Sequence, residues 1–167
     1  NVLGLEGASS TEIDHDTPHP VIDVLPEQKK IEGLGGNMRL GGQDVVVTPG
    51  SRLCRLYGDS ERIRLRFRHR YEVDPAYIER IEAAGLKFTG RAENHPIMQV
   101  LEIAENDHPY FIGTQAHAEL TSRPLRPDPM FLGLVRAAMI FSGAEPPSDE
   151  HNDSGHSHSE CDAASAV

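Results

Sequence analysis

The stretch from Arg62 to Val73, RIRLRFRHRYEV, constrains the fold more than any other, because its apolar and charged residues alternate strictly. Successive side chains of an extended strand point to opposite sides of the sheet. Ile63, Leu65 and Phe67 therefore face one way. The opposite side carries four arginines, Arg62, Arg64, Arg66 and Arg68. The pattern predicts a half-buried strand with a basic outer surface.

Other apolar and β-branched runs predict further strands along the chain. They cover residues 45–48, 86–91, 97–103 and 110–115. Because helices are predicted between and after these runs, the expected fold class is α/β, with a mixed sheet flanked by helices and antiparallel pairing among the later strands. The sequence contains no internal repeat.

Capping residues predict two helices. Asp74 and Pro75 suit the beginning of a helix that stops at Gly85. Asp128 suits the N-cap of a last helix over residues 129–141, PMFLGLVRAAMIF, which stops at Gly143. Since this last helix is apolar over most of its circumference, we expect it to be well buried.

Composition excludes several classes of protein. The 167 residues suffice for one domain with a core, and the net charge of -10 argues against binding to nucleic acid. No run approaches the length of about 18 apolar residues that a membrane-spanning helix needs. Cys54, in a strand-like segment, and Cys161 form no disulfide framework, so a reducing, cytoplasmic setting fits best. The first residues lack a signal peptide and an initiator Met, and the chain is expected to begin inside a longer protein.

Two segments invite a ligand-binding interpretation that their sequences support poorly. The glycine-rich piece at 33–42, GLGGNMRLGG, lacks the spacing of a phosphate-binding loop and is better explained as a tight connection into a strand. Residues 144–167 are acidic and without periodicity, and they are expected to form a disordered tail. His151, His156, His158 and Cys161 lie in this tail, but flexible His-rich tails usually bind metals weakly, so no metal site is predicted.

His117 and Glu119, in GTQAHAELTSRP, are two residues apart, just after an apolar run. If the strand continues through them, both side chains project to the same side. A carboxylate beside an imidazole fixes its tautomer and stabilises the imidazolium, which suits a general base. The pair by itself is weak evidence, since a histidine at the end of a strand is usually structural, and a base needs a nucleophile from elsewhere.

Four blocks in order resemble the class I glutamine amidotransferases, and within them the CTP synthases. They are NVLGLEGASSTEID, GGNMRLG, FRHRYEV, and QAHAELTSRP followed by DPMFLGLVRAA. The family's usual forms are N-S-T-E-F, G-G-T-M-R-L-G, H-R-H-R-Y-E-V and Q-x-H-P-E-[FL]-x-S-x-P. The resemblance covers residues 1–143 and implies the C-terminal portion of an amidotransferase domain, hence an incomplete domain.

The resemblance assigns roles to four residues. His117 matches the catalytic base and acid, and Glu119 matches the carboxylate that orients it. Glu12 and Arg70 match the acid and the arginine that bind the substrate glutamine. Without the family, the favoured interpretation is that Glu12 caps or solvates a loop and that Arg70 continues the outward row of arginines. Ala118 replaces the family's usual proline, which loosens the restraint on His117 without removing a reacting group.

The family's nucleophile is a cysteine in a G-x-C-L-G elbow, and this chain has no such motif. We therefore expect the 167 residues alone to lack glutaminase activity. In the intact enzyme, the resemblance implies that ammonia from glutamine aminates UTP with ATP and Mg²⁺ in a separate synthetase domain. It also implies GTP as activator and a homotetramer. The alternative is a non-catalytic, amidotransferase-like module for regulation or assembly.

Overall fold

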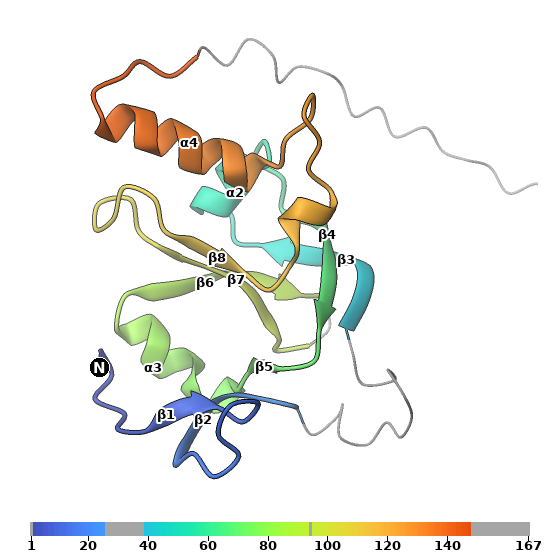
Figure 1. Ribbon diagram of the computed structural model, residues 1–167, viewed down its shortest axis with the longest axis vertical. Helices are drawn as coiled ribbons and strands as arrows, with labels where there is room; N and C mark the ends of the chain where they lie inside the picture. Colours follow the sequence, from blue (N-terminus) through green and yellow to red (C-terminus); the bar gives the residue numbers. More distant parts are fainter. Residues whose placement is uncertain (1, 26–38, 94, 148–167) are drawn as a thin grey trace, which may run out of the picture.

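The computed structural model describes residues 2–25, 39–93 and 95–147, and these residues form two sheets with helices around them (Figure 1). The glycine-rich segment at 33–38 and the tail from 148 onward, with its histidines and Cys161, lie outside the described residues. Within the described residues, no helix has the length and apolar character needed to cross a membrane.

The larger sheet has five strands in the order β4-β3-β6-β7-β8, and all its pairings are antiparallel. The strands are β3 (Arg39–Val47), β4 (Arg62–His69), β6 (Leu86–Ala92), β7 (Met98–Ile103) and β8 (Ile112–Thr114). The sheet curls, because Ala116, just after β8, bridges back to Phe67 of β4. The predicted antiparallel arrangement of the later strands is confirmed.

The smaller sheet has three strands and is mixed. It contains β1 (Ala8–Ser10), β2 (His19–Asp23) and β5 (Glu72–Val73). Strand β1 runs parallel to β2, and β5 pairs with β2 in the antiparallel direction. Strands β1 and β2 were not among the predicted strands, because both are short and neither sequence alternates between apolar and polar residues. The mixed sheets with flanking helices agree with the predicted fold class.

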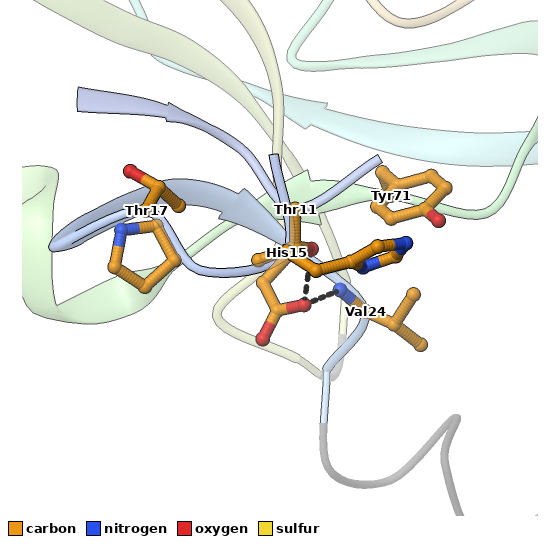
Figure 2. Close-up of a pocket in the computed structure, with 7 residues that line it drawn as sticks. Thr11, His15, Thr17, Val24 and Tyr71 are labelled. Carbon is orange, nitrogen blue, oxygen red and sulfur yellow. Dashed lines mark hydrogen bonds between the residues drawn. The ribbon is translucent and has the colours of Figure 1, made fainter. Parts of the chain in front are cut away.

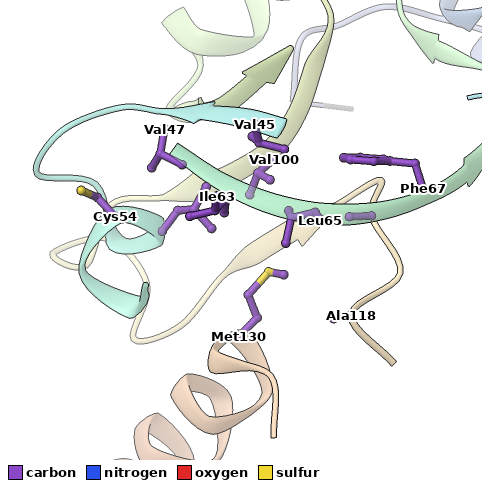
Figure 3. Packing of buried hydrophobic residues seen from close by; sticks show 11 residues of the cluster. Val45, Val47, Cys54, Ile63, Leu65, Phe67, Val100, Ala118 and Met130 are labelled. Atoms are coloured by element: carbon purple, nitrogen blue, oxygen red, sulfur yellow. The ribbon is translucent and has the colours of Figure 1, made fainter. Parts of the chain in front are cut away.

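Strand β4 confirms the alternation from which its burial was predicted. Ile63, Leu65 and Phe67 are buried, whereas the arginines between them are exposed. The buried side chains form the main core with Val45 and Val47 of β3 and Val100 of β7 (Figure 3). The predicted strand is shorter than expected, however, because a bend at Arg70 separates β4 from β5.

Two helices begin at the predicted caps. Asp74 accepts a hydrogen bond from Ala76 N (2.9 Å) and begins the 3-10 helix η1 (Pro75–Tyr77), which leads into α3 (Ile78–Ala83). Asp128 accepts from Met130 N (2.9 Å) and begins α4 (Pro129–Phe141). Gly85 and Gly143 have the positive φ angles of helix stops.

Helix α2 (Arg52–Leu56) corrects the prediction that Cys54 lies in a strand. Ser51 caps the helix by accepting a hydrogen bond from Cys54 N (3.0 Å). The buried Glu102 of β7 accepts from Arg52 N (2.9 Å), Leu53 N (3.1 Å) and Thr89 Oγ1 (3.0 Å). A carboxylate from a distant strand thus accepts hydrogen bonds from the first backbone N–H groups of this short helix. Local sequence patterns do not reveal such a partner.

Helix α4 is not well buried, contrary to the prediction. Met130 and Gly133 are its buried residues, and Met130 points toward Leu65 in the core (Figure 3). A Cβ on Gly133 would lie 2.7 Å from Leu56 Cδ2, so the glycine permits close packing on α2. The large apolar residues on the other sides are exposed, namely Phe131, Leu132, Leu134, Val135, Ile140 and Phe141. The prediction failed because the described fold packs against one side of the helix only.

The N-terminus of α4 is fixed by buried polar contacts. Tyr57 donates its hydroxyl to Asp128, at 3.1 Å from Oδ1, and Asp128 N donates to Ser122 Oγ (3.0 Å). Burial raises the pKa of Asp128, and burial with the adjacent Asp128 charge raises the pKa of Tyr57. Tyr57 therefore remains a hydrogen-bond donor at neutral pH.

Replacing Asp128 with alanine should lower the free energy of unfolding by about 1–2 kcal/mol, because the change removes the helix cap and the acceptor for Tyr57. Urea denaturation followed by circular dichroism of the 167-residue chain measures this. The matched control is Asp107→Ala at an exposed position, which should change stability by less than about 0.5 kcal/mol. Equal losses in the two variants would contradict the capping role.

Candidate active site

His117 lies where the large sheet closes on itself. Strand β8 stops at Thr114, whose hydroxyl accepts a hydrogen bond from Ala116 N (2.9 Å). His117 N then donates to Arg66 O of β4 (2.8 Å). The backbone of the histidine is therefore attached to the edge of β4, a strand whose other edge is paired with β3.

His117 and Glu119 form the predicted pair, but a different backbone geometry brings them together. His117 Nδ1 lies 2.7 Å from Glu119 Oε1. The strand does not continue through them, since residues Ala118–Leu120 form the 3-10 helix η2 with His117 as its N-cap. The condition of a continuing strand is therefore not met, because Leu120 N bonds back to His117 O (3.1 Å) and folds the segment into a turn.

The pair has the electrostatics of a base and its orienting carboxylate. The hydrogen bond with His117 lowers the pKa of Glu119, so the carboxylate is ionised at neutral pH. Because Glu119 occupies Nδ1, Nε2 is the ring nitrogen left to exchange a proton. The His117 side chain is 38% exposed, which leaves it accessible to a reactant.

Ala118 keeps the turn in place although it replaces the proline of the family pattern. It is the first residue of η2, a position that tolerates proline because its N–H has no partner inside the helix. Its side chain is buried and packs in the main core with Leu65 and Met130. Packing of Ala118 therefore contributes to the restraint on His117 that a proline ring would supply.

Arg70 lies in the bend between β4 and β5, not in the strand itself. The view that it simply continues the outward row of arginines is therefore incomplete, since that row ends with Arg68 inside β4. The Arg70 side chain is exposed, and within the described residues it makes no hydrogen bond or ion pair. It is thus available to a ligand's carboxylate.

Glu12 lies in the exposed turn that follows β1. Its backbone N donates to Ser10 Oγ (3.2 Å), and the neighbouring Thr11 N donates to Ile22 O of β2 (3.0 Å). The turn is therefore held by the small sheet while the carboxylate of Glu12 remains in solvent. Among the described residues, Glu12, Arg70 and His117 make no direct contact with one another.

A pocket of about 450 Å³ brings together the chain neighbours of Glu12 and Arg70 (Figure 2). Thr11 and Tyr71 both line it, with His15, Thr17, Pro20, Asp23 and Val24. Thr11 Oγ1 donates to Asp23 Oδ1 (2.6 Å), and Val24 N donates to the same oxygen (2.7 Å). The chain neighbours of the two predicted substrate-binding residues thus share a concave surface, whereas Glu12 and Arg70 themselves are not among the residues that line it.

The cysteine of the described residues does not complete a catalytic site. Cys54 is 2% exposed within the main core, and its thiol lies 3.7 Å from Ser60 O. Nor do His, Cys, Asp and Glu side chains gather in threes in the described part of the chain in a way that could hold a metal ion. The candidate pair of His117 and Glu119 therefore has no cysteine nucleophile beside it among the described residues.

Comparison with known proteins identifies the family. The family model for glutamine amidotransferase class-I matches residues 3–137, a span that includes all four predicted site residues. The chain belongs to the class I glutamine amidotransferase family.

Similar relatives include CTP synthases from several organisms. The chain is 55% identical over 139 residues to CTP synthase of Haloarcula hispanica, which covers 83% of the chain and 25% of that protein. It is 51% identical over 145 residues to CTP synthase of Archaeoglobus fulgidus, covering 87% of the chain and 27% of that protein. The chain therefore spans about a quarter of the length of these relatives.

A solved structure gives the same result for the fold. The glutaminase domain of CTP synthase from Trypanosoma brucei, solved with bound acivicin, superposes with a TM-score of 0.76 at 29% identity. The superposition covers 88% of this chain and 55% of that chain. The resemblance to the CTP synthases seen in the sequence motifs is confirmed.

The structure also shows amidotransferase site neighbours to which the sequence analysis gave no role. Gln115 donates its side-chain N–H to Tyr71 O (3.4 Å), which ties the segment before His117 to the residue after Arg70. Both residues stand inside the family motifs, at the glutamine of QAH and the tyrosine of RHRYEV. Their place in those motifs was the available signal, but their contact required the fold.

The carboxyl of Glu119 should titrate below the ordinary glutamate pKa of 4.5, because His117 stabilises its ionised form. Its stabilising contribution is then present above the unfolded-state pKa and is lost as pH falls through the folded-state pKa. Carbon NMR of the carboxyl measures this value. The change His117→Ala should raise the pKa toward normal, whereas His108→Ala at an exposed turn should not. A Glu119 pKa that is the same in both variants would contradict the pair.

Proposed function

We propose that this chain is the glutaminase portion of a CTP synthase. Together with a nucleophile from outside these residues, it takes part in hydrolysing glutamine to supply ammonia for the ATP-dependent amination of UTP to CTP, and the 167 residues alone are expected to be inactive. The observation that carries the proposal is the contact of 2.7 Å between His117 Nδ1 and Glu119 Oε1, in a chain about half identical to CTP synthases. The reducing, cytoplasmic setting is part of the same proposal and agrees with a free, buried Cys54.

The chemistry assigned to His117 is proton transfer through Nε2. A cysteine thiol gives its proton to His117 and attacks the side-chain carbonyl carbon of glutamine, and His117 passes that proton to the departing ammonia. The histidine then takes a proton from water, which attacks the thioester, and returns it to the cysteine sulfur as glutamate is released. Glu119 stabilises the imidazolium in both steps. Neither cysteine of the chain stands in a glycine elbow, so the nucleophile belongs to a part of the enzyme outside these residues.

Substrate binding is assigned to Glu12 and Arg70. Glutamine carries an ammonium and a carboxylate on one carbon, and an acid and an arginine complement them. Both residues are exposed, and their neighbours line one pocket. UTP, ATP, Mg²⁺, the activator GTP and the homotetramer are assigned to the intact enzyme. No step through Mg²⁺ is assigned to this chain, because the donor sets among its described residues do not fit a metal.

In the full-length enzyme, His117→Ala should lower the glutamine-dependent rate of CTP formation by at least about 100-fold, as for a lost general base. The rate with added ammonia should stay near that of the parent enzyme, because ammonia bypasses glutamine hydrolysis. His108→Ala is the matched control and should leave both rates unchanged. If both rates fall together in His117→Ala, the role of His117 is wrong. If neither falls, the non-catalytic module is favoured.

Arg70→Ala should raise the KM for glutamine by about ten-fold or more with little change in kcat, the pattern of lost ground-state binding. Arg68→Ala, on the outward face of β4, removes a neighbouring charge from the strand and should change KM by less than about two-fold. Steady-state kinetics with glutamine as the varied substrate separates the two. Equal effects of the two variants would favour a general electrostatic effect over a specific contact.

A further inference from the structure

A buried ionic cluster lies directly beneath the linker that carries Arg70. Glu72, the first residue of β5, is 0% exposed, and its Oε1 accepts a hydrogen bond from Arg39 Nε (2.9 Å). His69, the last residue of β4, places Nε2 at 3.0 Å from the same oxygen, outside hydrogen-bonding geometry. The cluster of Arg39, His69 and Glu72 thus holds both ends of the two-residue linker Arg70–Tyr71.

The cluster joins the two sheets of the molecule. Arg39 begins β3 opposite His69 in the large sheet, and Glu72 pairs with Asp23 of β2 in the small sheet. Arg39 is further held by Gln43, whose Oε1 accepts from Nη1 (2.8 Å). An ion pair in the interior keeps its geometry, because removing either partner leaves a buried charge without compensation. The pair of Arg39 and Glu72 therefore sets how the small sheet lies against the large one.

Glu12 and Arg70 are attached to opposite sides of this connection. Glu12 follows β1, which pairs with β2, and the neighbouring Thr11 bonds to Ile22 and Asp23 of β2. Arg70 follows β4 of the large sheet. The distance between the Glu12 carboxylate and the Arg70 guanidinium thus depends on the angle between the small sheet and the large sheet. A second contact, from Gln115 to Tyr71 O, relates the same linker to His117.

We propose that Glu72, through its ion pair with Arg39, is a positioning residue that sets the spacing between Glu12 and Arg70 for binding glutamine. This inference rests on the proposed function. Glu72 touches no substrate, since its side chain is fully buried. Its effect is to hold the exposed Arg70 at one fixed place relative to the turn that carries Glu12. Glutamine presents its ammonium and carboxylate groups at a fixed separation, so a shift of the linker weakens binding of the substrate.

The test is Glu72→Gln in the full-length enzyme, which preserves the shape of the side chain and removes its charge. The KM for glutamine should rise by about ten-fold, with kcat and the ammonia-dependent rate within about two-fold of the parent. Simple loss of folded protein lowers the apparent kcat and leaves KM unchanged. A KM within two-fold of the parent overturns the proposal.

Glu102→Gln is the matched control, because Glu102 is also a buried carboxylate but serves the start of α2. It should lower thermal stability without raising the KM for glutamine. If it raises KM as much as Glu72→Gln, the effect is a general one and the positioning role is wrong. The conservative change Glu72→Asp keeps the charge, so its KM for glutamine should lie between those of the parent enzyme and Glu72→Gln.

Two further variants keep the outcome decisive. If Glu72→Gln does not accumulate as folded protein, Arg39→Lys keeps a cation but loses the Nε donor, and it should raise KM in the same way. An unchanged KM in Arg39→Lys overturns the proposal. Arg70→Ala is measured in parallel. If Arg70→Ala raises KM and Glu72→Gln does not, only the positioning role of Glu72 is wrong. If neither variant raises KM, the assignment of the glutamine site to Glu12 and Arg70 is wrong as well.

Discussion

Strand β4 is paired along both of its edges, and the arrangement of the candidate site depends on this. One edge pairs with β3 over eight residues from Arg39 to Val46, and the other receives Ala116 and His117. Its apolar face supplies Ile63, Leu65 and Phe67 to the core. Because a paired strand with one buried face can neither slide nor rotate, the backbone of His117 is fixed relative to the whole sheet.

Buried carboxylates connect the parts that backbone pairing does not. Glu72 joins the small sheet to the large one through Arg39, and Glu102 joins β7 to the start of α2. Glu102 accepts from three donors, whereas Glu72 is paired with Arg39 through Oε1 and its Oε2 is buried without a hydrogen-bond partner. Removing water from a charge is costly, so each carboxylate depends on the partners that remain to it. They therefore favour one relative placement of the elements.

Elements whose evidence is local were predictable from the sequence. The alternation of β4, the caps Asp74 and Asp128, and the stops Gly85 and Gly143 are all found as expected. Elements that depend on distant partners were missed. Helix α2 needs Glu102 for its first N–H groups, and the short strands β1 and β2 are held by pairing to each other and, for β2, to β5. The exposure of α4 was also missed, because it depends on the described fold packing against only one side of the helix.

The sequence by itself determined the family motifs, the strand that supplies the core, and the presence of a histidine and a glutamate two residues apart. Only the tertiary structure decided how these residues meet. A 3-10 turn, not an extended strand, places Glu119 on His117 Nδ1, and the edge of β4 holds that turn. The bend at Arg70 and the burial of Glu72 were equally invisible in the pattern. The 3-10 turn is itself local, but its attachment to β4 and the burial of Glu72 depend on contacts between residues far apart in the chain, which no local periodicity records.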